Sequence, residues 1–143
     1  HPKFLADYLA LAEEYRLVAF LPNMTRATLA GIDRAAMADD YLQVLEKIDR
    51  EQVPTLDEIL IETLIPLEDK STFYRQLIDG IKPGLSHLLF HPACMSDELL
   101  AIDHERPGSR HADYLAWREP ALKQYILDAG IHLIGYKELQ AHL

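Results

Sequence analysis

Short apolar runs alternate with longer amphipathic segments along this chain, and this alternation limits the folds open to it. The runs are bounded by proline, glycine or charged residues and are shorter than typical helices. Runs of this kind are typical of strands that are buried on both faces of a parallel sheet. We therefore expect strands at residues 17–22, 58–62, 85–91 and 131–135.

Helical spacing of apolar residues marks the segments between these runs. We expect helices at residues 2–16, 25–50, 69–81, 111–129 and 137–142, with a break in the second near Asp39-Asp40 and a long polar loop at 97–107. Alternation of helix and strand predicts the α/β class. Three or four strands in 143 residues fit either a small open sheet or about half of a (β/α) barrel, and the abrupt start at His1-Pro2 favours half a barrel.

Composition excludes several classes of function. The chain has 14 basic and 23 acidic residues, a formal charge of −9, which opposes binding to nucleic acid. No apolar run reaches the ~20 residues of a membrane span, so no membrane partner is expected. A single cysteine, Cys94, rules out an internal disulfide framework and fits a cytoplasmic protein.

The stretch Gly84–Pro92 reads GLSHLLFHP and carries two histidines. In a helix, His87 and His91 would share one face, as in zinc-binding helices. The breakers on both sides and the lack of a third ligand at a recognisable spacing favour a strand instead. Because the two residues would then lie roughly 13 Å apart, they would not hold one ion together.

His91 lies at the carboxyl end of this expected strand. Catalytic groups collect at such ends because the following loops form the crevice. His91 is therefore a candidate functional residue, whereas His87, deeper in the strand, is expected to be a buried neutral histidine. Arg110 is a candidate contact to a substrate or to a carboxylate, and Cys94 is expected to be a small buried hydrophobic residue.

These residues resemble the C-terminal half of the YdjC/ChbG-like carbohydrate deacetylases. The resemblance rests on Gly84–Pro92 with its His-Pro strand end, on Arg110 and Arg118-Glu119, and on the closing segment Ala129–Leu139. Residues 4–22 also resemble the helix and strand that follow the family's histidine-rich metal motif. The family's Asn-Ala-Asp-Asp start and its internal metal-histidine motif have no counterpart here. The metal ligands are therefore expected upstream of His1, with His1 itself as a candidate remnant of the motif.

The resemblance implies that residues 1–143 are a single α/β domain, part of the C-terminal half of a TIM-like (β/α) barrel with parallel strands. It implies a metal-dependent deacetylase of N-acetylated carbohydrates such as chitooligosaccharides, in which a divalent ion, Mg or Zn, activates water. His91 maps onto the family's His-Pro histidine. Its implied role is the general acid that protonates the leaving amine.

A second class of function stays open at this point. Because the metal ligands are missing, the chain can also be a non-catalytic α/β module that binds a ligand or partner through the same crevice. Under either hypothesis, half a barrel would expose unpaired strand edges. We therefore expect residues 1–143 alone to form a homodimer or aggregate. Because the metal ligands are missing, we also expect them to be inactive.

Overall fold

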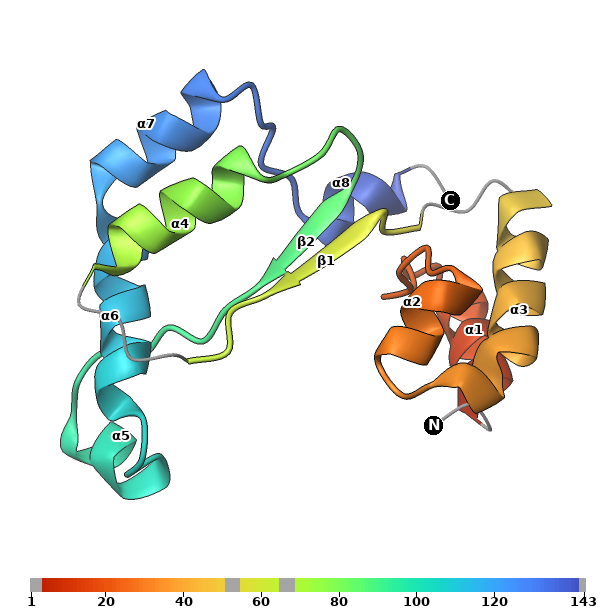
Figure 1. The fold of residues 1–143 in the computed structure, drawn as a ribbon, viewed down its shortest axis with the longest axis horizontal. Coiled ribbons are helices and arrows are strands. Elements are labelled where there is room, and N and C mark those ends of the chain that lie inside the picture. The colour runs from red at the N-terminus through yellow and green to blue at the C-terminus, as the bar shows by residue number, and fades with distance from the viewer. Residues whose placement is uncertain (1–3, 51–54, 65–68, 142–143) are drawn as a thin grey trace. The chain divides into compact units, whose positions relative to one another are not determined.

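The computed structural model describes residues 4–50, 55–64 and 69–141 (Figure 1). Contacts divide the chain into two compact units. The first comprises His1–Glu58 with Ile134–Leu143, and the second comprises Ile59–Leu133. Within the described residues, no helix is long and apolar enough to cross a membrane.

The first unit is helical. Its elements are α1 (Leu5–Glu14), α2 (Arg26–Gly31), the 3₁₀ helix η2 (Ala35–Met37), α3 (Ala38–Arg50) and α8 (Tyr136–Gln140). Helix α2 begins at Thr25, whose side chain accepts a hydrogen bond from Thr28 N–H, as expected of an N-cap threonine. The buried core consists of Ala12, Ala19, Leu21, Leu29, Ala38, Tyr41 and Ile48.

Two expected strands are not strands in this structure. Among the described residues, 17–22 contribute a single parallel bridge, between Pro22 and Leu56, and 131–135 have no sheet partner. Ala19 and Leu21 pack into the helical core, whereas Leu17 and Phe20 are exposed, so burial in this run does not require a ladder. The expected helical break near Asp39-Asp40 was also misplaced. The chain breaks at Ile32–Arg34, and the two aspartates lie in the first turn of α3.

The second unit contains the sheet. Strands β1 (Glu58–Ile61) and β2 (Ser86–Leu89) pair in parallel, and the boundary between the units falls within β1. Helix α4 (Lys70–Asp79) connects the two strands, as in a βαβ unit, and α5 (Asp97–Ile102), α6 (Pro107–Arg118) and α7 (Pro120–Asp128) follow (Figure 1). The strands expected at 58–62 and 85–91 are thus present, slightly shortened.

An apolar cluster joins α4, α6 and α7. Its buried members are Tyr74, Ile78, Ala116, Leu122 and Ile126. The Phe90 ring, just beyond β2, stacks on Trp117 of α6 with 4.5 Å between ring centroids. This packing fixes the chain immediately before His91 against α6.

The segment after β2 is more helical than expected. Residues 97–107 were expected to be a loop, but Ser96 accepts a hydrogen bond from Leu99 N–H and starts α5. The helix expected at 111–129 is two helices, because Pro120 disfavours helical geometry at Glu119, which is extended. The α/β class is nevertheless confirmed, with a two-stranded parallel sheet among the described residues.

Candidate active site

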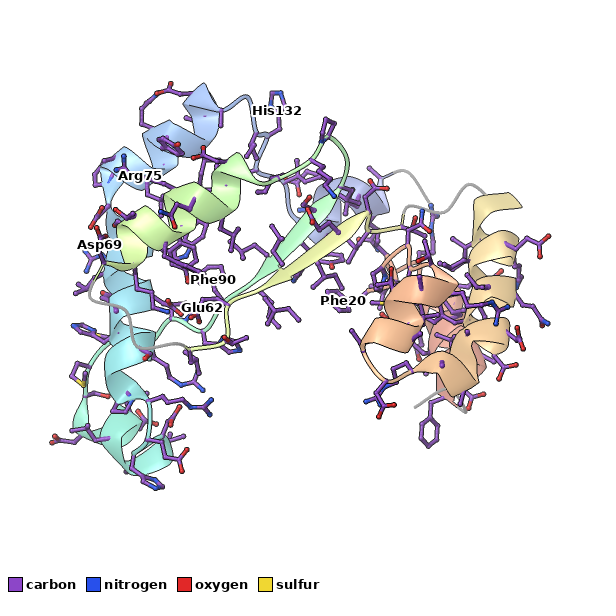
Figure 2. The ribbon with its side chains drawn as sticks, viewed as in Figure 1. Phe20, Glu62, Asp69, Arg75, Phe90 and His132 are labelled. Atoms are coloured by element: carbon purple, nitrogen blue, oxygen red, sulfur yellow. The ribbon has the colours of Figure 1, made fainter. Side chains whose placement is uncertain are left out.

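The carboxyl ends of the two strands bring Glu62 and His91 together. Glu62 directly follows β1, and its backbone N–H donates to Leu89 O at the end of β2, at 2.9 Å. His91 comes two residues after Leu89, and its Nδ1 lies 3.9 Å from Glu62 Oε2. Figure 2 shows Glu62 just beyond the sheet, on the side of α4 and α6.

Lys70 lies beside Glu62 and links it to a second carboxylate. Its Nζ donates to Glu62 Oε1 at 2.5 Å and lies 3.1 Å from Asp113 Oδ1. All three residues are at most 3% exposed. A buried charge is tolerated only when it is paired and hydrogen-bonded, and this ammonium pairs with both carboxylates. Lys70 opens α4 and Asp113 lies in the middle of α6, so the pair also ties the two helices together.

Asp113 accepts two further hydrogen bonds. The Tyr74 hydroxyl donates to Oδ1 at 2.8 Å, and the backbone N–H of His91 donates to Oδ2 at 3.4 Å. The carboxylate on α6 therefore holds the backbone at the catalytic candidate itself. Glu62, Lys70, Tyr74 and Asp113 are called the buried charge cluster below.

Titration properties in the cluster follow from its hydrogen bonds. Burial acts to raise the pKa of the Glu62 carboxyl, but hydrogen bonds from Lys70 Nζ and Leu64 N–H outweigh it and hold the pKa below its usual value. For Tyr74, burial and then the hydrogen bond to Asp113 raise the pKa of the phenol above its usual value. Glu62 is thus ionised and Tyr74 neutral near pH 7.

The turn after Glu62 holds its carboxylate from the backbone. Leu64 has φ of 59°, a left-handed conformation that costs a residue other than glycine about 1–2 kcal/mol. In this conformation its N–H donates to Glu62 Oε2 at 2.8 Å, while its side chain is buried. Glu62 Oε2 therefore has a fixed position facing His91 Nδ1.

The imidazole of His91 is partly open to solvent. Its side chain is 31% exposed, yet Nδ1 is buried and makes no hydrogen bond among the described residues. The exposed part of the ring must then lie on its other atoms. This arrangement leaves the ring accessible from outside while one nitrogen faces the buried charge cluster.

Arg110 is engaged within the protein. Its Nε donates to Asp103 Oδ2 at 2.6 Å, and its backbone carbonyl accepts from Ala93 N–H at 3.1 Å. The guanidinium lowers the pKa of the Asp103 carboxyl. Arg110 thus holds the segment after His91 to the start of α6, and its contact with a substrate stays a prediction. Cys94 in the same segment is exposed, so the expectation of a buried cysteine was wrong.

The sequence prediction found His91 but missed Glu62, Lys70 and Tyr74 as its neighbours. The signal was present in the helices. On α4, Lys70 comes four residues before Tyr74 and eight before Ile78, so all three lie on the buried face of the helix. On α6, Asp113 shares the buried face with Ala116. A charged residue at an apolar position of a helix indicates a buried ion pair, because an unpaired charge there is prohibitively costly.

The described residues do not provide a metal site. They contain no group of three or more His, Cys, Asp or Glu side chains that fits a metal ion. His1, the predicted remnant of a metal motif, lies outside the described residues. His87, which was expected to be buried, lies half-buried in β2, and its structural role stays a prediction.

Comparisons with known proteins agree with the resemblance seen in the sequence. The chain is 30% identical over 127 residues to a carbohydrate deacetylase of Thermus thermophilus, covering 89% of this chain and 44% of that protein. It also matches the crystal structure of a proposed cellobiose-phosphate cleavage protein of Enterococcus faecalis V583, with a TM-score of 0.63 and 25% identity, covering 97% of this chain and 48% of that one. No protein-family model matches.

This chain therefore spans about half the length of each of these relatives. The match to the deacetylase extends along most of the chain and so includes residues of both compact units. In sequence and in fold, the chain is a relative of the YdjC-like carbohydrate deacetylases.

Proposed function

We propose that this chain is part of a hydrolase that removes acetyl groups from N-acetylated carbohydrates, with chitooligosaccharides as the substrate class. The relationship to a carbohydrate deacetylase supports the reaction type. One observation connects the proposed reaction with specific residues. His91, a partly exposed imidazole at the carboxyl end of a parallel strand, lies beside an ionised carboxylate buried behind it.

His91 is the proposed general acid. Hydrolysis of an acetamide requires a proton on the departing sugar amine, and an imidazolium with an accessible ring edge supplies one. The ring is exposed away from Nδ1, so the side of His91 opposite the buried charge cluster is the side that a substrate can reach. Arg110, whose backbone carbonyl accepts a hydrogen bond from Ala93 N–H two residues after His91, is a proposed substrate contact.

A divalent metal ion, Mg or Zn, is proposed on the basis of the resemblance. Such an ion polarises an amide carbonyl and activates water. No described group of residues fits it, so we derive no step through the ion and assign no ligand. Three further expectations likewise stay proposals: residues 1–143 form one domain within a TIM-like barrel, the protein is cytoplasmic, and it forms a homodimer.

The test is an assay of acetate release by the full-length protein. N-acetylated and fully deacetylated chitooligosaccharides are incubated with it in the presence of Mg²⁺ or Zn²⁺ and, separately, of a chelator. We expect acetate and free amine in equal amounts from the acetylated sugars only, with loss of activity in chelator. If no N-acetylated sugar releases acetate but the sugars bind, the chain is a carbohydrate-binding module and the deacetylase proposal is wrong.

A further inference from the structure

The buried charge cluster places two carboxyl groups, those of Glu62 and Asp113, beside a single ammonium, that of Lys70. All three residues are at most 3% exposed. Polar groups in such a site need hydrogen-bond partners, because a buried polar group without one is unfavourable.

His91 Nδ1 is a buried polar atom beside this cluster. The titratable groups that the described residues place around it are Glu62 beyond β1, Lys70 and Tyr74 from α4, and Asp113 from α6. Of these, Lys70 is already held by both carboxylates. Within the described part of the chain His91 Nδ1 makes no hydrogen bond, and Glu62 Oε2 lies 3.9 Å from it. Glu62 Oε2 is therefore the acceptor in position to orient this nitrogen.

Arg110 and His111, in the first half of α6, are held by other partners. Arg110 is paired with Asp103, and His111 accepts a hydrogen bond from Met95 N–H through its own Nδ1. These contacts tie the two side chains to residues on either side of α5.

We propose that Glu62 is a positioning residue for His91: its carboxylate, fixed by Lys70 and by Leu64 N–H, orients the imidazole through Nδ1. The proposal rests on the proposed function and deepens it, since a general acid must be correctly oriented before it meets its substrate. Glu62 acts through His91 and does not itself touch the substrate. The left-handed backbone at Leu64 is consistent with this role, because that conformation fixes Glu62 Oε2.

The tautomer of His91 tests the proposal without any activity. The ring signals of His91, one of seven histidines, are assigned in NMR spectra of the protein by their loss in His91→Asn. We expect Glu62→Gln to reduce the fraction of His91 rings that carry the proton on Nδ1, since the carboxylate facing Nδ1 is replaced by an amide. The matched control is Glu105→Gln, the same change at an exposed loop position, which should leave the His91 tautomer unchanged. An unchanged His91 tautomer in Glu62→Gln overturns the proposal.

A second variant covers the case in which Glu62→Gln does not fold. Glu62→Asp keeps the charge for Lys70 but withdraws the carboxylate by about 1.5 Å, one carbon–carbon bond. We expect a smaller change in the His91 tautomer and a kcat for acetate release reduced roughly tenfold at unchanged KM, the pattern of a lost proton-transfer contribution. If neither quantity changes, Glu62 has no positioning role. If the His91 tautomer changes as expected but the wild-type protein releases no acetate, the Glu62–His91 relation stands and the deacetylase function fails.

Discussion

The Tyr74 hydroxyl on α4 donates a 2.8 Å hydrogen bond to Asp113 Oδ1 on α6, and both residues are fully buried. The same carboxylate oxygen lies 3.1 Å from Lys70 Nζ, and the other oxygen accepts from the His91 backbone. One aspartate therefore joins two helices to the end of a strand. The stability of the second unit and the position of the candidate acid depend on the same side chain.

Replacing Tyr74 with Phe should destabilise the second unit without a change of charge. The variant removes one donor from the buried Asp113 carboxylate, a loss of about 1–3 kcal/mol in the free energy of unfolding. Urea denaturation measures it. Tyr114→Phe is the matched control, because its hydroxyl accepts a solvent-exposed hydrogen bond from Arg118, and we expect a change within about 0.5 kcal/mol. Equal effects of the two variants would show that the Tyr74–Asp113 bond contributes nothing particular.

Replacing Lys70 with Met should be far more damaging. Glu62 and Asp113 would remain as two buried carboxylates without their ammonium, and loss of one partner of a buried ion pair costs about 3–5 kcal/mol. Thermal denaturation followed by circular dichroism measures the effect. Lys123→Met, the same change at an exposed position of α7, should leave the melting temperature nearly unchanged. A Lys70→Met protein as stable as wild type would mean that the cluster is not ionised as described.

Acid should reduce the stability that Glu62 contributes, because the pKa of its carboxyl is lowered in the folded protein. A carboxyl whose pKa is depressed by folding adds stability above its unfolded value, about 4.3, and loses it as the pH falls through the folded value. The stability difference between wild type and Glu62→Gln should therefore be largest near neutral pH and shrink below about pH 4. Depressed carboxyls elsewhere, such as Asp69 and Asp103, act equally in both proteins and cancel. A pH-independent difference in urea midpoints would contradict this assignment.

The sequence predicted the elements that depend on a local pattern of residues. It did not predict which apolar runs pair with a distant strand. Strand β2 and the position of His91 at its end followed from the apolar run and its flanking breakers. The segment 17–22 has the same local pattern, yet its apolar residues pack on helices and it forms a single bridge. Whether an apolar run enters a ladder depends on a partner strand that local sequence does not specify.

The buried charge cluster was missed for a related reason. Lys70 and Asp113 lie far apart in the sequence, and each alone is compatible with an exposed helix face. Only their contact through the packing of α4 against α6 makes them a pair. The burial of each is therefore a tertiary property, although the interruption of an apolar stripe by a charge was visible in both helices.

The assignment of His91 as the general acid makes a prediction that separates chemistry from stability. In the full-length protein, His91→Ala should lower kcat for acetate release by roughly 10²–10⁴, the usual effect of losing a proton-transfer group. Stability should change by less than about 1 kcal/mol, because the side chain is 31% exposed and its Nδ1 has no hydrogen bond to lose within the part of the chain that the structure describes. His104→Ala, at an exposed position of the following loop, is the control and should change neither quantity. A structural histidine predicts the opposite pattern, a lowered melting temperature with activity lost only as the protein unfolds. A folded His91→Ala protein with near-normal kcat would remove His91 from the mechanism.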